Sequence, residues 1–130
     1  MRQLLLDTNA LIALSDANHA VFRAAEAALR KGGEASTCSV AWHEYVRGPL
    51  LDKDRSRVLR VIESRILNLD RRHAETAAKL FNTTGRRRGS TADCLIAAVA
   101  IDSNLEMVTC NTGDFELFIP HGLRLFDLSM

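Results

Sequence analysis

Short apolar runs alternate with longer segments of helical periodicity along this chain. A short apolar run bounded by polar residues is typical of a strand buried in a parallel sheet. Apolar residues that recur every three or four positions indicate a helix with one buried face. The predicted strands are residues 3–6, 35–38, 66–69, 107–110 and 123–126, and at 66–69 the pattern also allows a helix. The predicted helices are residues 9–14, 19–30, 40–47, 54–65, 70–82 and 91–103.

The alternation of strands and helices predicts one α/β domain over residues 1–130, with a mostly parallel sheet between two layers of helices. Right-handed crossovers bring the carboxyl ends of parallel strands to one edge, where such folds bind their ligands. Asp7, Ser39 and Asn111 each follow a predicted strand, so we expect all three at that edge. Ser39 is also predicted to cap the next helix, while residues 83–89 and 111–113 are predicted as a loop and a turn.

Length and composition are those of a soluble globular domain: 130 residues, 47% apolar and 25% charged. No apolar run approaches the roughly 20 residues of a membrane-spanning helix, and Asp7 interrupts the first apolar run too early for a secretory signal. We therefore expect a cytoplasmic protein. The cysteines Cys38, Cys94 and Cys110 form no CxxC pair, and we expect small buried side chains in a reducing compartment. The alternative, a zinc site of Cys38, His43 and Cys110, matches no zinc spacing pattern.

Two carboxylates fall on helix faces that are predicted to be buried. Glu44 follows apolar residues three and four positions before it, and Asp93 precedes apolar residues three and four positions after it. A buried carboxylate needs an opposite charge, a proton or a bound cation, because its desolvation is costly. Simpler explanations stay open: a salt bridge from Glu44 to Arg47, and a favourable interaction of Asp93 with the helix dipole.

Two further acids come after predicted strands. Asp7 follows the first strand directly, and Asp114 follows the fourth strand and its turn. Asp7 as a helix N-cap and Asp114 as a turn residue are the ordinary roles. Four carboxylates that meet without matching cationic side chains repel one another unless a divalent cation neutralises them. Mg²⁺ and Mn²⁺ bind carboxylate oxygens and commonly act on substrate phosphates, so the four acids together point to metal-dependent chemistry on a phosphate group.

The net charge of +1 exerts no global attraction on nucleic acid, but the arginines are clustered. Arg86, Arg87 and Arg88 form a basic loop just before the predicted helix that carries Asp93, where they would hold a phosphate backbone. The alternative is an ordinary solvated face. A second group of arginines lies in the predicted helix at residues 54–65: Arg55, Arg57, Arg60 and Arg65.

Four segments carry a further signal because they occur in this order along nearly the whole chain. They are LLDTN at residues 5–9, SVAWHE at 39–44, TADCLIAAVA at 91–100 and VTCNTGDF at 108–115. Together they resemble the motifs of PIN-domain ribonucleases, most closely the VapC toxins of bacterial and archaeal toxin–antitoxin pairs.

The resemblance implies a three-layer α/β/α fold and a Mg²⁺- or Mn²⁺-dependent endoribonuclease that is blocked by a cognate antitoxin. It also implies a homodimer. The implied catalytic and metal-binding acids are Asp7, Glu44, Asp93 and Asp114. Thr8 and Asn9 would order the first acid, and Thr109 and Asn111 the last. Some family members carry the fourth acid where Asn111 stands here. With RNA as substrate, the phosphate-binding loop would be Arg86, Arg87 and Arg88.

Other functions remain as alternatives. A catalytically silent PIN-like domain would bind RNA or protein without cleaving it. A phosphatase with Asp7 as nucleophile, similar to the haloacid dehalogenase family, would need a second aspartate two residues later, where this chain has Asn9. A purely structural domain is the simplest alternative, and the acids on apolar helix faces argue against it.

Overall fold

A computed structural model of the chain describes residues 1–129. It contains a five-stranded sheet in the order β3-β2-β1-β4-β5, and every neighbouring pair of strands is parallel. The strands are β1 (Gln3–Leu6), β2 (Glu34–Cys38), β3 (Ile66–Leu67), β4 (Glu106–Val108) and β5 (Arg124–Leu125). The predicted strands are thus confirmed, although the last two predicted runs are shorter than expected and β3 has only two residues.

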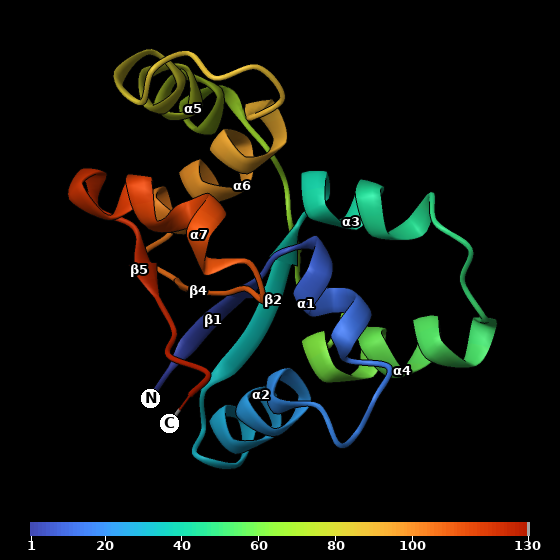
Figure 1. Cartoon of the computed structure of the whole chain (residues 1–130). Helices are drawn as coiled ribbons and strands as arrows, with labels where there is room; N and C mark the ends of the chain where they lie inside the picture. Colours follow the sequence, from blue (N-terminus) through green and yellow to red (C-terminus); the bar gives the residue numbers. More distant parts are fainter. Residues whose placement is uncertain (130) are drawn as a thin grey trace.

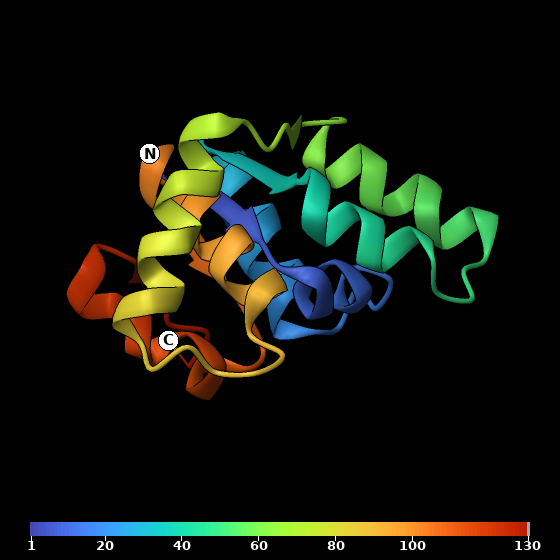
Figure 2. The same ribbon diagram turned by 90° about the horizontal axis from the view of Figure 1, so that it is seen from above.

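The helices cover both faces of the sheet, which gives the expected three-layer α/β/α architecture (Figure 1). On one side lie α1 (Thr8–Ala13), α2 (Ala20–Arg30) and α4 (Asp52–Ile62). On the other side lie α5 (Arg71–Thr83), α6 (Thr91–Asp102) and α7 (Thr112–Phe115). Between the layers, α3 (Ser39–Val46) continues from the end of β2 and contacts both α1 and α6. The view from above shows α3 and α4 projecting from one side of the molecule (Figure 2).

The central strands of the sheet lie in the hydrophobic core. Leu4, Leu5 and Leu6 of β1 are at most 1% exposed, as expected for a strand covered on both faces. Residues 35–38 of the neighbouring β2 are also buried, although two of them carry hydroxyl groups, because each hydroxyl finds a backbone acceptor on β1. Ser36 Oγ donates to the Leu4 carbonyl at 2.8 Å, and Thr37 Oγ1 donates to the Leu6 carbonyl at 2.7 Å. These bonds offset the cost of burying the hydroxyls.

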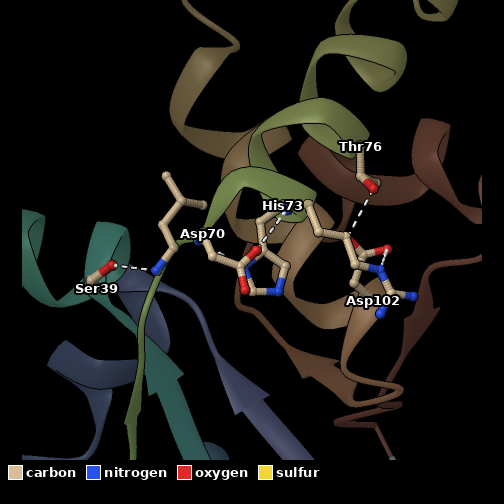
Figure 3. Close-up of polar contacts among 7 residues, drawn as sticks. Ser39, Asp70, His73, Thr76 and Asp102 are labelled. Atoms are coloured by element: carbon tan, nitrogen blue, oxygen red, sulfur yellow. Dashed lines mark hydrogen bonds and ion pairs between the residues drawn. The ribbon is translucent and has the colours of Figure 1, made fainter.

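One predicted cap is wrong. Ser39 is the first residue of α3 and not its cap; the N-cap position is Cys38, whose side chain makes no capping bond. The Ser39 hydroxyl instead accepts a hydrogen bond from the Leu69 backbone N–H at 3.2 Å (Figure 3). It therefore holds the connection between β3 and α5 against the start of α3. The same close-up shows Asp70 and His73 forming the capping box that begins α5.

The segment after β4 also differs from the prediction. Residues 111–113 were expected to form a turn, but Thr112–Phe115 form the short helix α7, followed by the 3-10 helix η1 (Glu116–His121). Phe115 and Phe118 are buried and their rings meet edge to face at 6.1 Å, so tertiary packing stabilises a segment too short to be a stable helix alone. None of the helices in residues 1–129 is long and apolar enough to cross a membrane.

Candidate functional site

Asp7 directly follows β1. It is both the N-cap of the next helix and one of the acids of the candidate site. It is the N-cap of α1, since Oδ1 accepts a hydrogen bond from the Ala10 backbone N–H at 2.9 Å. Its other oxygen, Oδ2, accepts a hydrogen bond from the Thr109 hydroxyl at 2.5 Å. Asp7 is only 4% exposed, and this burial raises the pKa of its carboxyl, while the bonds from Thr109 and Ala10 act in the opposite direction.

Glu44 lies on α3 and faces the start of α1. Its Oε1 accepts a hydrogen bond from the Thr8 hydroxyl at 2.6 Å, and its Oε2 lies 3.8 Å from Nη2 of Arg47. The Glu44 side chain is 26% exposed and that of Arg47 is 64% exposed, so the ion pair is a weak one at the surface. The predicted salt bridge is therefore present, but it leaves the carboxylate at the site.

Asp93 lies in the first turn of α6 and is half-buried. Its pKa is raised from 3.8 to about 6, first by burial and then by the negative charges of Asp114, Glu44 and Asp7. The positive charge of Arg87 opposes this rise. Because the other three acids all act on Asp93, the repulsion expected from a group of carboxylates is present in this fold.

The remaining site residues, Thr109, Asn111 and Asp114, follow strand β4. Thr109 is buried beyond the end of β4, and its oxygen accepts a hydrogen bond from the Asn111 backbone N–H at 3.0 Å while its proton goes to Asp7. Asn111 and Asp114 are exposed at the start of α7. Thr109 therefore joins the turn before α7 to the carboxylate at the end of β1.

These elements surround a cavity of about 190 Å³ at the carboxyl edge of the sheet. The four acids line it together with Thr8, Asn9 and Asn111, whereas Ser39, also expected at this edge, does not. Two polar partners differ from those implied by the family resemblance. The Thr8 hydroxyl bonds Glu44 and not Asp7, and the Thr109 hydroxyl bonds Asp7 and not Asp114. Spacing along the chain did not indicate these pairs, because each joins distant segments.

The donor set of this cavity suits a hard divalent cation. Its lining offers carboxylate, amide and hydroxyl oxygens, which are the ligands preferred by Mg²⁺ and Mn²⁺. The excess negative charge that raises the pKa of Asp93 is what such a cation would offset. Within residues 1–129, however, no three His, Cys, Asp or Glu side chains are already grouped closely enough to hold a metal ion. The residues fit a cation in chemistry and charge, and coordination would require their side chains to close in.

The other candidate groups lie apart from this cavity. Cys38 and Cys94 are buried as expected, but Cys110 is exposed, so the expectation of three buried thiols is wrong for that residue. It follows Thr109, whose side chain points inward, and successive side chains of an extended segment point to opposite sides. Arg86, Arg87 and Arg88 are exposed in the loop before α6 and do not line the cavity.

Comparison with known proteins identifies the family. The model of the PIN domain matches residues 4–117. No curated protein matches the chain.

Several solved structures share the fold. VapBC-1 from nontypeable Haemophilus influenzae superposes with a TM-score of 0.75 at 17% identity, covering 98% of this chain and 99% of the other. DNA-bound VapBC from Salmonella typhimurium gives a TM-score of 0.72 at 22% identity, with 98% and 99% covered. VapBC-5 from Mycobacterium tuberculosis, a member of the VapBC family of toxin–antitoxin systems, gives a TM-score of 0.60 at 25% identity. The match covers 96% of this chain and 100% of the other. With its parallel sheet, its acid-lined cavity and a family match over most of its length, the chain belongs to the PIN domain family.

Proposed function

We propose that this protein is a Mg²⁺- or Mn²⁺-dependent endoribonuclease and the toxin of a toxin–antitoxin pair. The observation that carries the proposal is the convergence of Asp7, Glu44, Asp93 and Asp114 on one cavity from four separate elements. Purely structural roles do not require the four acids to converge, since a helix cap, a salt bridge or a turn residue can serve anywhere in the fold. The likeness to chains from toxin–antitoxin complexes supports the biological setting.

In this proposal, Asp7, Glu44 and Asp93 hold the cation, and Asp114 contributes directly or through water. When bound there, the cation would supply a Lewis acid for the phosphate and would lower the pKa of a water molecule. The chain's own residues prepare the site. Thr109 holds one Asp7 oxygen and the Ala10 N–H holds the other, while Thr8 fixes the Glu44 carboxylate. Asn9 and Asn111 line the cavity and present amide groups to the substrate or its water.

The substrate is RNA, bound in part by the basic loop of Arg86, Arg87 and Arg88. A folded RNA with a single-stranded loop is the class we propose, because unpaired bases and a bent backbone can enter a small cavity. The partner is a cognate antitoxin that covers the acidic site. We also propose that the protein forms a homodimer and works in the cytoplasm.

The test is RNA-end sequencing after brief induction in a bacterial host, comparing the wild-type protein with Asp7→Ala. New RNA ends are expected at defined sites with the wild type and not with the variant. Identical end patterns for the two proteins would contradict the proposal. Growth arrest that is relieved by coexpression of a neighbouring gene product would support the toxin–antitoxin assignment.

The alternative is a catalytically silent PIN domain that binds RNA or protein. It is favoured by one observation: within residues 1–129, no three His, Cys, Asp or Glu side chains are already close enough together to hold a metal ion. Calorimetric titration with Mn²⁺ separates the two functions, because a silent site should give no binding heat that depends on Asp93. The nuclease should bind Mn²⁺, and Asp93→Asn should weaken that binding.

A further inference from the structure

Arg86 and Arg87, in the loop between α5 and α6, have different surroundings. Arg86 follows α5 and is held against the end of that helix. Its backbone is left-handed, with φ of 52°, and its N–H donates to the Phe81 carbonyl at 2.9 Å. Its guanidinium carbon lies 5.6 Å from the centre of the Phe81 ring, and Nη1 donates to Oδ1 of Asn82 at 2.8 Å. The Arg86 side chain is therefore engaged in holding the end of this helix.

Arg87 is held by its backbone and leaves its side chain unpaired. Its carbonyl accepts hydrogen bonds from the Ser90 N–H at 3.2 Å and from the Ser90 hydroxyl at 2.8 Å. Ser90 is buried, and its own carbonyl accepts the first helical bond of α6 from Cys94 at 2.9 Å. The Arg87 guanidinium is exposed and makes no hydrogen bond or ion pair with the described part of the chain.

Arg87 is also the arginine of this loop that is bonded to the start of α6, because its carbonyl accepts both hydrogen bonds from Ser90, the N-cap residue of that helix. The loop leads directly into the first turn of α6, which carries Asp93 (Figure 2). The positive charge of Arg87 opposes the rise in the pKa of Asp93, which lies in that turn. Arg47, at the end of α3, is by contrast paired with Glu44.

A phosphodiester approaching four carboxylates meets a repulsive field, and a single dication offsets only part of it. An unpaired cation fixed at the rim would attract the phosphate without first giving up another partner. Arginine suits this task because its planar guanidinium can donate two parallel hydrogen bonds to one phosphate. We propose that Arg87 is the substrate-binding arginine of this site, contacting an RNA phosphate beside Asp93, whereas Arg86 stabilises the loop and Arg88 contributes only diffuse charge.

This inference rests on the proposed ribonuclease function, and its test has a readout that does not need cleavage. A fluorescently labelled RNA hairpin is titrated with full-length protein in EDTA, so that the RNA stays intact, and anisotropy is recorded over a series of salt concentrations. The variants are Arg87→Ala, Arg87→Lys, Arg88→Ala as the charge-matched control, and Arg86→Ala. Melting temperatures are measured for all of them.

We expect Arg87→Ala to weaken RNA binding about tenfold, the usual effect of losing one charge-assisted hydrogen-bonding group. Its log–log salt slope should fall by about 0.7, the value for one phosphate contact to a single strand. Arg87→Lys should retain the slope and lose part of the affinity, since it keeps the charge but not the planar fork. Arg88→Ala should bind within about twofold of the wild type, and Arg86→Ala should mainly lower the melting temperature.

Equal losses for Arg87→Ala and Arg88→Ala would overturn the assignment, because they would show a diffuse basic loop. Unchanged binding by Arg87→Ala would overturn it as well. The proposed function is read separately, by adding Mn²⁺ to the wild-type protein and following the RNA on a gel. Wild-type protein that binds but never cleaves would contradict the nuclease proposal while the comparison of the arginine variants still stands.

Discussion

The Thr109 hydroxyl donates a 2.5 Å hydrogen bond to Oδ2 of Asp7, although 102 residues separate them in the chain. The bond is possible because β1 and β4 are parallel neighbours, with Leu6 opposite Val108, so the residues that follow them leave the sheet side by side. It orients a carboxylate that is almost fully buried and favours its ionised form.

Thr109→Val should therefore weaken Mn²⁺ binding and destabilise the protein. The loss leaves a buried carboxylate oxygen without its donor, which costs about 1–3 kcal/mol in the free energy of unfolding. It also removes an interaction that lowers the pKa of Asp7. Calorimetry and urea unfolding measure the two effects. Thr109→Ser is the matched control, since it keeps the hydroxyl; a Ser variant as defective as Val would show that packing of the methyl group matters instead.

Asp93→Asn should abolish RNA cleavage while the protein stays folded. The change removes a carboxylate oxygen ligand and keeps the size of the side chain, so the first turn of α6 should be preserved. A gel assay with Mn²⁺ and a far-UV circular dichroism spectrum measure activity and fold. EDTA should have the same effect on wild-type protein, and cleavage that survives EDTA would contradict metal dependence.

The raised pKa of Asp93 makes the stability of the metal-free protein depend on pH. The folded carboxyl titrates at about 6 and the unfolded one at 3.8, so between these values the folded state binds more protons. The free energy of unfolding should therefore fall as pH rises through this window and level off above it. Solvent screening at this half-buried group limits the effect to roughly 1–2 kcal/mol.

Asp93→Asn should flatten this pH dependence and stabilise the metal-free protein at neutral pH, because the amide carries no charge to repel the other acids. Urea unfolding in EDTA, repeated at several pH values, measures the change. If the wild type instead gained stability with rising pH across the same window, the repulsion at the site would not control its titration.

Metal binding should show the opposite trend to stability, because a protonated Asp93 is a poor ligand. The affinity for Mn²⁺ should be highest above pH 6, where the carboxyl is ionised, and should fall as pH drops through that value. RNA cleavage should follow the same curve. Calorimetric titrations across the range measure it, and an affinity independent of pH would exclude Asp93 as a ligand.

Gly33→Ala should destabilise the fold far from the proposed site. A Cβ on Gly33 would lie 2.2 Å from the Arg2 carbonyl oxygen, next to the Glu34 N–H that bonds this carbonyl at the start of β2. The backbone must shift to relieve the clash, at a cost of roughly 1–3 kcal/mol. Gly48→Ala is the control, because its Cβ would make an ordinary 3.5 Å contact with the Tyr45 carbonyl. Denaturant unfolding compares them, and equal stabilities would contradict the close approach.

Much of the architecture could be predicted from local patterns. The predicted strand at residues 3–6 has the same two ends as β1 in the structure. Each predicted helix is also present, with its ends moved by at most three residues. Such segments are recognisable because one periodic apolar face determines both their type and their burial. The helix after β4 was missed because its stability comes from Phe115 and Phe118, which pack in the core. Ser39 was misassigned because its hydroxyl bonds Leu69, thirty residues further on.

The amino-acid sequence alone determined the order of the elements and the position of each acid at a strand end or on an apolar helix face. Those features depend on residues within a few positions of one another, so they can be recognised in the chain itself. Only the tertiary structure decided which side chains meet: Thr8 with Glu44, and Thr109 with Asp7. These pairings depend on strand order and on the direction of each side chain, and distances along the chain do not record either.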